Sequence, residues 1–383
     1  MKLSDKIYVA GHNGMVGRAI VKKLKDKKLN VLSVNKNELD LTDQTQTFNW
    51  IKKNSPQVIF IAAAKVGGIL TNSLNQAEFL YQNLMIQNNI IRSAAENNVQ
   101  KLIFLGSSCI YPKESTQPIK EEALLCKPLE KTNEGYAIAK IAGLKLCSYL
   151  FKEQNKDFIT IMPTNLYGPN DNFDLTTSHV LAALINKITY AKKYKKESVE
   201  IWGTGEPKRD FLHVKDLANA FIAASLSTKS KGQIFNVGSG KGITFINMVK
   251  TIIQSVGKGS FQNIPWPKDY INVETGDYIT NITKAKNILN WKPEINFKEG
   301  IRMTVEYYTK YILKYLNTLC LYPTKKILFF NLPFNINCSD FNFSKVFSNL
   351  AFSLFKSTKL SSGIKHSIPG MDIFIDPFWI EDE

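Results

Sequence analysis

A tyrosine and a lysine four residues apart, Tyr136 and Lys140, form the pair in this sequence best suited to proton transfer. On a helix, residues four apart share one face, so the phenol and the ammonium group would point at the same cleft. A phenol with a pKa of about 10 transfers protons poorly at neutral pH, but an adjacent cation lowers that pKa. We therefore expect Tyr136 to be a general acid or base with a pKa lowered by Lys140.

A serine pair supplies a second chemical signal. Ser107 and Ser108 follow Leu102–Leu105, an apolar segment with the pattern of a buried strand. The carboxyl ends of strands are where α/β sheets place their chemistry. Either serine can hold the substrate oxygen that gains or loses a proton, while Lys140 can also hydrogen-bond a nicotinamide ribose.

A glycine-rich turn near the start of the chain predicts a dinucleotide site. Three glycines spaced as GxxGxxG follow the apolar segment Ile7–Ala10 and precede a helical pattern. Glycines allow the tight turn and let backbone N–H groups approach a pyrophosphate at the helix N-terminus. The residues expected to contact the cofactor here are Gly11, His12, Asn13, Gly14, Met15, Val16 and Gly17.

The end of the second predicted strand distinguishes NAD from NADP. An acidic residue at that point would bind the free ribose 2′-hydroxyl of NAD. The sequence offers Val34-Asn35-Lys36-Asn37 instead, in which Lys36 can pair with a 2′-phosphate. NADP(H) is therefore the expected cofactor, and either Asp40 or Asp43 is expected to flank the adenine.

Alternating apolar and amphipathic segments predict the scaffold that positions these residues. Short apolar runs predict buried parallel strands at Ile7–Ala10, Val31–Val34, Val58–Ala62, Leu102–Leu105 and Phe158–Met162. Amphipathic stretches predict helices at Met15–Lys28, Thr45–Asn54, Ala77–Asn97 and Tyr136–Asn155. The alternation indicates an α/β fold, a Rossmann-type doubly wound parallel sheet.

Beyond about residue 170 the alternation is looser. After an expected loop at Pro163–Asn172, we expect helices at His179–Lys193 and Asp216–Leu226, and strands at Val199–Trp202 and Ile234–Val237. We expect an NADP-binding Rossmann domain at 1–170, to which the later chain also contributes strands and helices. A smaller C-terminal substrate-binding lobe is expected at 171–316, and a Phe-rich extension at 317–383.

Composition narrows the classes of function. The 383 residues are 44% hydrophobic and 21% charged, which is ordinary for a globular protein. The net charge of +16 suits a phosphorylated small molecule as well as a polymer, and the lysines are too scattered to predict a nucleic-acid partner. We expect no signal peptide and no transmembrane helix. Five cysteines without CxxC spacing predict no metal site and no disulfide framework, as in a reducing cytoplasm.

Longer motifs carry a family resemblance. They are Ala62–Ile69 (AAAKVGGI), Gly106–Lys113 (GSSCIYPK), Tyr136–Gly143 (YAIAKIAG), Met162–Phe173 (MPTNLYGPNDNF), Ser178-His179 and Arg209–His213 (RDFLH). The Ser–Tyr–Lys set resembles the extended short-chain dehydrogenase/reductase family. From about residue 5 to residue 240, the longer motifs are similar to the GDP-L-fucose synthases within that family.

The resemblance implies an activity. Members are bifunctional: they epimerise C3 and C5 of GDP-4-keto-6-deoxy-D-mannose and then reduce the C4 ketone with NADPH, which forms GDP-L-fucose. Epimerisation beside a ketone needs a base on one face and an acid on the other, and the resemblance assigns Cys109 and His179 to these tasks. Both side chains can titrate near neutrality when perturbed.

The resemblance also implies binding residues. Lys187 and Arg209 would bind the diphosphate, and Trp202 would pack on the sugar or the base. Further cofactor contacts would come from Leu105, Gly106, Ser107, Ser108, Tyr136, Lys140, Pro163, Thr164, Asn165, Leu166 and His179. Homodimers are common in the family, so a homodimer is expected.

The resemblance weakens past residue 260. The sequences of Ile264–Tyr278 and Trp291–Ile301 are more similar to those of other nucleotide-sugar epimerases and dehydratases. The identity of the nucleotide base and of the sugar is therefore left open. The alternatives are a 4-epimerase or dehydratase, or a reductase of a related GDP-4-keto-deoxy sugar. A non-enzymatic dinucleotide sensor could dispense with Tyr136, Lys140, Cys109 and His179 together, so their joint presence argues against it. The phenylalanines of the extension suit packing on the domain, a partner contact or a membrane surface.

Overall fold

The computed structural model describes residues 3–175, 177–193, 198–266, 276–320, 365–368 and 371–374. The chain divides into two units, residues 1–323 and 324–383. In the second unit the described elements are β13 (Lys365–Ile368) and β14 (Met371–Phe374), which pair antiparallel. The phenylalanines of the C-terminal extension from Phe329 to Phe355 lie outside the described residues.

The first unit is built on a six-stranded sheet in the order β10-β5-β4-β3-β1-β2. Every neighbouring pair in it is parallel. The strands are β1 (Lys6–Ala10), β2 (Asn30–Leu32), β3 (Val58–Ile61), β4 (Lys101–Leu105), β5 (Phe158–Pro163) and β10 (Ile234–Val237). The predicted Rossmann-type sheet is confirmed, and its sixth strand comes from the later chain.

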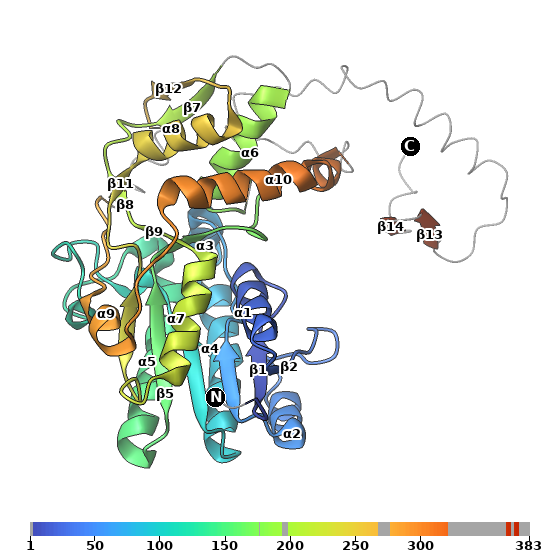
Figure 1. Ribbon diagram of the computed structural model, residues 1–383, viewed down its shortest axis with the longest axis vertical. Helices are drawn as coiled ribbons and strands as arrows, with labels where there is room; N and C mark the ends of the chain where they lie inside the picture. Colours follow the sequence, from blue (N-terminus) through green and yellow to red (C-terminus); the bar gives the residue numbers. More distant parts are fainter. Residues whose placement is uncertain are drawn as a thin grey trace. The chain divides into compact units, whose positions relative to one another are not determined.

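Helices cover both faces of this sheet because successive strand residues point to opposite sides. Ile7 and Val9 pack in one core cluster with side chains of α1 (Met15–Asp26) and α7 (Val214–Leu226). Tyr8 and Ala10 pack in another with side chains of the helices α2, α4 and α5. Those three helices are α2 (Gln44–Asn54), α4 (Gln76–Glu96) and α5 (Glu134–Gln154). The result is the three-layer arrangement seen in Figure 1.

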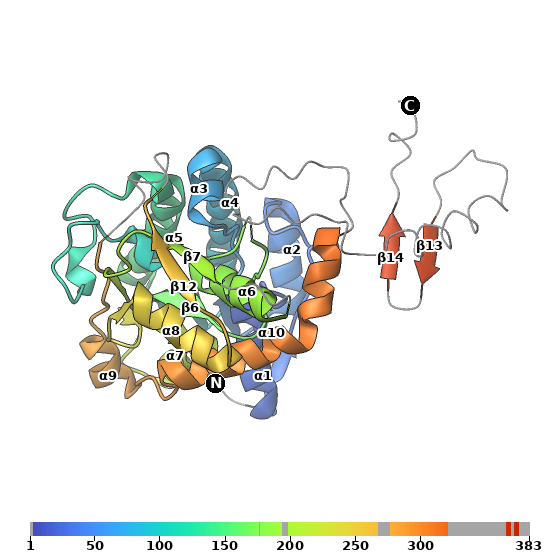
Figure 2. The same ribbon diagram turned by 90° about the horizontal axis from the view of Figure 1, so that it is seen from above.

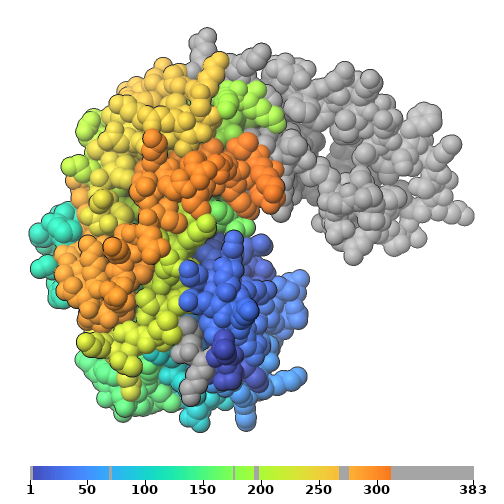
Figure 3. All heavy atoms as spheres, in the orientation of Figure 1, coloured from blue at the N-terminus to red at the C-terminus, as the bar shows by residue number. Residues whose placement is uncertain are grey.

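A smaller lobe has its own apolar core. Its elements are α6 (Val180–Lys193), β7 (Val199–Trp202), α8 (Phe245–Val256), β12 (Phe261–Ile264) and α10 (Phe297–Cys320). The strands β7 and β12 pair in parallel. Figures 1 and 2 show these elements gathered at one end of the central sheet. On the face shown in Figure 3, α8 (yellow) and α10 (orange) form one continuous surface above the blue residues of α1.

Short elements join the two parts. They are α3 (Ile69–Leu74), β6 (Asn165–Tyr167), β8 (Lys208–Arg209), β9 (Phe211–His213), β11 (Ile243–Thr244), α9 (Thr283–Leu289) and three 3-10 turns at Ser108–Ile110, Glu121–Ala123 and Lys131–Asn133. The prediction of an uninterrupted loop at Pro163–Asn172 is wrong, because Asn165–Tyr167 pairs in parallel with β9. Among the described helices, none is long and apolar enough to cross a membrane.

Candidate active site

The glycine turn forms a tight cradle at the start of α1. Gly11 has a φ of +81°, and its carbonyl accepts a hydrogen bond from the Gly14 N–H at 3.1 Å. A Cβ on Gly11 would lie 2.5 Å from the Ala63 backbone nitrogen, and one on Gly17 would lie 2.1 Å from the Gly11 oxygen. Gly14 caps α1 without a side-chain hydrogen bond, so the first N–H groups of the helix remain available to an anion.

Four of the predicted catalytic side chains meet at the end of β4. The Ser107 hydroxyl lies 2.9 Å from the Cys109 sulfur. Lys140, which is buried, donates a hydrogen bond from Nζ to the Leu105 carbonyl at 2.8 Å. The same Nζ lies 5.7 Å from the centre of the Tyr136 ring. The structure therefore brings Ser107, Cys109, Tyr136 and Lys140 into one cluster.

The electrostatics of this cluster differ from the expectation in one respect. Burial, reinforced by the Cys109 charge, raises the pKa of Tyr136, although a hydrogen bond with Ser107 opposes the shift. The prediction that Lys140 lowers this pKa is wrong, because the desolvation of the phenol dominates. Burial also lowers the pKa of Lys140 to about 8. At neutral pH the phenol keeps its proton beside a lysine that is still largely charged.

The Cys109 thiol is likewise less acidic than expected. Burial raises its pKa to about 11, although the Ser107 hydrogen bond and the Lys140 charge both lower it. A pKa near neutrality, as the sequence suggested, would need the two favourable partners to outweigh the loss of hydration. They do not, so Cys109 is a protonated thiol at neutral pH.

Helix α4 holds the reactive groups in place through two buried amides. The Asn83 side chain accepts from the Lys65 N–H and donates to the Lys65 carbonyl, each at 3.0 Å, which fixes the loop after β3. The Gln87 amide donates to the Ala139 carbonyl at 2.5 Å. Ala139 directly precedes Lys140 on α5, so this hydrogen bond fixes α5 against α4 next to the cluster.

His179 comes from the other lobe and directly precedes α6. Its loop is held against the sheet because the Gly68 N–H, in the loop after β3, donates to the Thr177 carbonyl at 3.1 Å. β3 neighbours β4, whose end carries Ser107 and Cys109. The imidazole is open to solvent, yet the surrounding protein removes part of its hydration, and this desolvation lowers its pKa.

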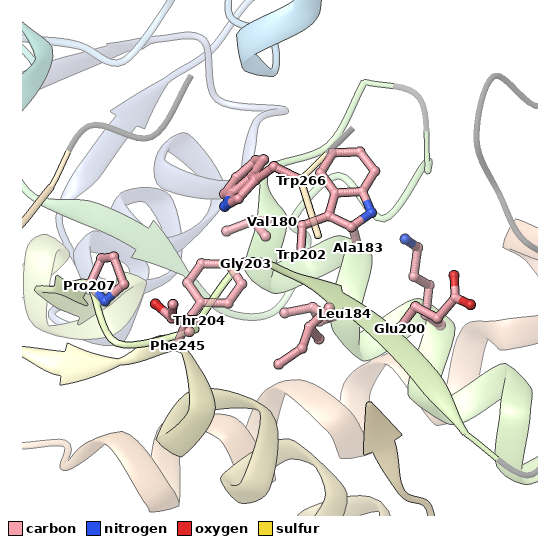
Figure 4. A pocket seen from close by; sticks show the side chains of 13 residues that line it. Val180, Ala183, Leu184, Glu200, Trp202, Gly203, Thr204, Pro207, Phe245 and Trp266 are labelled. Atoms are coloured by element: carbon pink, nitrogen blue, oxygen red, sulfur yellow. The ribbon is translucent and has the colours of Figure 1, made fainter. Parts of the chain in front are cut away.

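A cavity of about 290 Å³ lies in the smaller lobe, next to the start of α6. Trp202 and Trp266 line it with ring centres 5.6 Å apart, and Figure 4 shows both rings across from Leu184 and Phe245. Lys187 and Glu200 supply its charges. Desolvation lowers the pKa of Lys187, and the Glu200 charge opposes this shift. Two of the predicted substrate residues, Lys187 and Trp202, thus share one mainly apolar cavity.

The other predicted binding residues lie outside this cavity. Arg209 donates from Nη1 to the carbonyls of Gly276 and Lys208, which ties β8 to the segment that follows residue 275. Thr164 and Asn165, from the stretch Pro163–Leu166, donate side-chain hydrogen bonds to the Asp210 carbonyl at 2.8 and 3.0 Å. The backbone is engaged as well, because the Thr164 N–H donates to the Val237 carbonyl at 3.0 Å and Asn165–Tyr167 pairs with β9.

The structure adds residues that sequence reasoning missed. Tyr278 reaches the catalytic cluster, where its hydroxyl donates to the Ser108 carbonyl at 3.4 Å. Trp266 and Phe245 line the cavity, and the Glu130 charge acts on Cys109. Tyr278 and Trp266 belong to the stretch that departs from the fucose synthases, so no motif pointed to them. The family resemblance was the signal for the pocket, and it pointed to Lys187 and Trp202 alone among the lining residues.

Comparison with known proteins identifies the family. Residues 7–238 match the NAD dependent epimerase/dehydratase family. This chain belongs to that family. A GDP-L-fucose synthase from Sinorhizobium fredii is 48% identical over 252 residues, 66% of this chain and 80% of that protein. GDP-L-fucose synthase 1 of Arabidopsis thaliana is 44% identical over 310 residues, 80% of this chain and 94% of that protein.

A solved structure is also similar to this chain. It is a GDP-mannoheptose C4 reductase from Campylobacter jejuni with NADP bound, 32% identical and with a TM-score of 0.73, and the match covers 81% of this chain and 99% of that one. The Arabidopsis alignment is longer than the stretch from residue 5 to 240 that carries the sequence motifs. The family relationship therefore extends into the region where those motifs weaken.

Proposed function

We propose that this chain is a bifunctional nucleotide-sugar enzyme that converts GDP-4-keto-6-deoxy-D-mannose to GDP-L-fucose with NADPH. The observation that carries the proposal is the 2.9 Å contact between the Cys109 sulfur and the Ser107 hydroxyl. Serine, tyrosine and lysine suffice for ketone reduction. A thiol beside the hydroxyl that would hold the ketone oxygen adds a proton carrier next to the carbons that a ketone makes acidic.

The glycine cradle suits the dinucleotide that this reaction needs. The close packing of Gly11 and Gly17 leaves the first N–H groups of α1 exposed to a pyrophosphate. NADP(H) supplies a hydride when bound. We assign its binding to residues 11–17, Lys36, residues 105–108 and 163–166, Tyr136, Lys140 and His179. Residues 1–170, together with the strands and helices that the later chain adds to this domain, would thus hold the cofactor. Residues 171–316 would hold the nucleotide sugar.

Tyr136 would supply the proton in the reduction. Ser107 orients the C4 oxygen, and the phenol donates its proton as that oxygen becomes an alkoxide. The raised pKa of Tyr136 keeps the phenol protonated until an alkoxide, which is a stronger base, forms beside it. The charge of Lys140 then stabilises the phenolate that remains.

Cys109 and His179 would exchange the protons at C3 and C5. Inversion of a carbon requires removal of a proton on one face and its return on the other. Burial keeps Cys109 as a thiol, whereas desolvation keeps His179 as a neutral imidazole, so the pair holds one transferable proton and one vacant position. The two groups come from different lobes, as attack from two sides of one sugar requires.

The cavity of the smaller lobe suits the nucleotide. Trp202 and Trp266 can pack on a base or sugar, and Lys187 can pair with the diphosphate. Because α6 runs from the residue after His179 to the cavity wall, one helix would connect the reacting sugar with the nucleotide. Arg209 would reach the diphosphate from β8.

We further infer that the enzyme is a homodimer. Large apolar side chains are exposed on α3, α4 and α5: Leu74, Tyr81, Ile138 and Tyr149. A second copy on this face would bury them, and light scattering of the purified chain tests this. The free thiols of Cys109, Cys126 and Cys147 suit the reducing cytoplasm.

The deciding experiment incubates the enzyme with GDP-4-keto-6-deoxy-D-mannose and NADPH and identifies the product by NMR. We expect GDP-L-fucose with one NADPH consumed per product. A reduced sugar with unchanged configuration at C3 and C5 would make the chain a plain C4 reductase. A product without net NADPH consumption would point to the 4-epimerase or dehydratase alternative.

A further inference from the structure

The loops that end β1 and β2 are joined by a pair of asparagines. Asn13, in the glycine turn, donates a hydrogen bond from Nδ2 to Oδ1 of Asn35 at 2.9 Å. Asn35 in turn donates to the Glu38 carboxylate at 3.1 Å. In a Rossmann fold the adenosine ribose lies between these two loops. The bridge therefore marks the place where a ribose 2′-phosphate would arrive, and neither asparagine supplies a charge.

Arg18 lies directly beside this bridge. It is in the first turn of α1, and its Nε donates to the Asn13 carbonyl at 2.8 Å. Side chains on a helix lean toward its N-terminus, so the guanidinium is directed back toward the glycine turn. The residue is exposed. Within the described part of the chain, the two terminal nitrogens of its guanidinium have no hydrogen-bond acceptor.

Lys36 alone supplies little charge at this point. It is exposed in the loop after β2, and it lies close enough to Asp40 to affect that carboxylate. The pKa of Asp40 is lowered first by hydrogen bonds from Thr42 and then by the Lys36 charge. The Lys36 charge thus already acts on a neighbouring carboxylate. A phosphate monoester carries a charge of about −1.5 to −2 near pH 7, which one ammonium does not balance.

We propose that Arg18 is a specificity-determining residue that pairs with the 2′-phosphate of NADP(H), opposite Lys36. The Arg18 Nε keeps its hydrogen bond to the Asn13 carbonyl, which fixes the plane of the guanidinium, while the two terminal nitrogens bind two phosphate oxygens. Arginine suits this task because its donors match a phosphate in a bidentate geometry. The proposal rests on the NADP(H) assignment above and deepens it.

Equilibrium binding tests this without any sugar substrate. Dissociation constants for NADPH and NADH are measured by calorimetry on the wild type, Arg18→Gln, Lys36→Gln and the double variant. Lys25→Gln, which removes one positive charge from an exposed position further along α1, is the matched control. Competition by adenosine 2′,5′-bisphosphate and by 5′-AMP isolates the contribution of the 2′-phosphate.

We expect Arg18→Gln to weaken NADPH and the bisphosphate roughly tenfold or more, with NADH and 5′-AMP changed less than about twofold. The control should change neither cofactor. Equal weakening of NADPH and NADH would show that Arg18 only supports the turn through Asn13, and no weakening would also overturn the proposal. A wild type that fails to bind NADPH would instead contradict the cofactor assignment itself.

Discussion

The Cys109 sulfur and the Ser107 hydroxyl are 2.9 Å apart, with Tyr136 and Lys140 in the same cluster. The short turn Ser108–Ile110 after β4 produces this contact, because it folds the thiol back over the serine. If Ser107 holds the ketone oxygen as proposed, Cys109 would be a proton carrier next to the neighbouring carbon. The contact would then join the proposed reductase and epimerase parts of the site.

Tyr136→Phe should nearly abolish reduction. The raised pKa of the phenol keeps it protonated for delivery to an alkoxide. General acid catalysis contributes on the order of 10² to 10⁴ in rate, so kcat for NADPH oxidation with the 4-keto sugar should fall by about that factor. Stopped-flow absorbance at the nicotinamide band measures it.

Cofactor binding provides the control for Tyr136→Phe, since this change removes one of many assigned cofactor contacts and leaves the glycine cradle and Lys140 in place. The dissociation constant for NADPH should stay within about twofold of wild type. Reduction at the wild-type rate would show that another group donates the proton, such as Tyr278, whose hydroxyl bonds to the Ser108 carbonyl.

The wild type should use NADPH in preference to NADH. Lys36 stands in the loop after β2, where a carboxylate would select NAD, and Asn35 and Asn37 flank it without charge. Steady-state kcat/KM is measured for both cofactors at saturating sugar. Equal values, or better use of NADH, would contradict the assignment.

Asp171→Asn should stabilise the fold at alkaline pH and not at acidic pH. Asp171 is buried, and burial raises its pKa to about 7, against the effect of the Asn172 N–H that it accepts. Between pH 4 and 7 the native state therefore holds a proton that the unfolded chain has lost. Stability decreases with rising pH over this window, and the cost of charging is complete above pH 7.

The neutral amide that Asp171→Asn introduces removes that cost. The free energy of unfolding should exceed wild type by about 2 to 4 kcal/mol at pH 8, with little difference near pH 4. Urea melts at both pH values measure this. Asp26→Asn, at an exposed position at the end of α1, is the control and should show no such pH dependence. A gain of equal size at both pH values would exclude ionisation as the cause.

The sequence predicted the central sheet well because its signals are local. The apolar run Ile7–Ala10 lies within one residue of β1, and the spacing of Tyr136 and Lys140 placed both side chains at one site. Periodicity and the glycine turn depend on neighbouring residues, so each could be interpreted without the rest of the chain.

The properties that escaped the sequence depend on distant residues. Whether Lys140 or desolvation controls the pKa of Tyr136 is decided by the burial of the phenol, which only the packed lobes determine. Tyr278 reaches Ser108 across 170 positions of sequence, and no periodic pattern carries such a contact. The short strand β6 forms only because β9 lies beside it.

Cys109→Ser should retain the fold and the cofactor but lose most epimerisation. A serine hydroxyl can keep a hydrogen bond with Ser107 but is a far weaker acid than a thiol. His179→Gln should impair the same step by removing the other proton carrier. Each variant is run in deuterated water with the 4-keto sugar, and NMR follows deuterium entry at C3 and C5, the two carbons that the C4 ketone makes acidic.

The wild type should incorporate label at both carbons, and each variant should do so at least about a hundredfold more slowly. Cys126→Ser, which changes an exposed thiol away from the cluster, is the matched control and should exchange normally. Binding of NADPH distinguishes loss of chemistry from loss of fold, because a loss of fold would abolish it, whereas a change of Cys109, or of His179 as one of many assigned cofactor contacts, leaves the glycine cradle intact. If Cys109→Ser and His179→Gln both exchange at wild-type rates, the two residues are structural. The Ser107–Cys109 contact would then serve only the packing of the turn, and the enzyme would be a reductase alone.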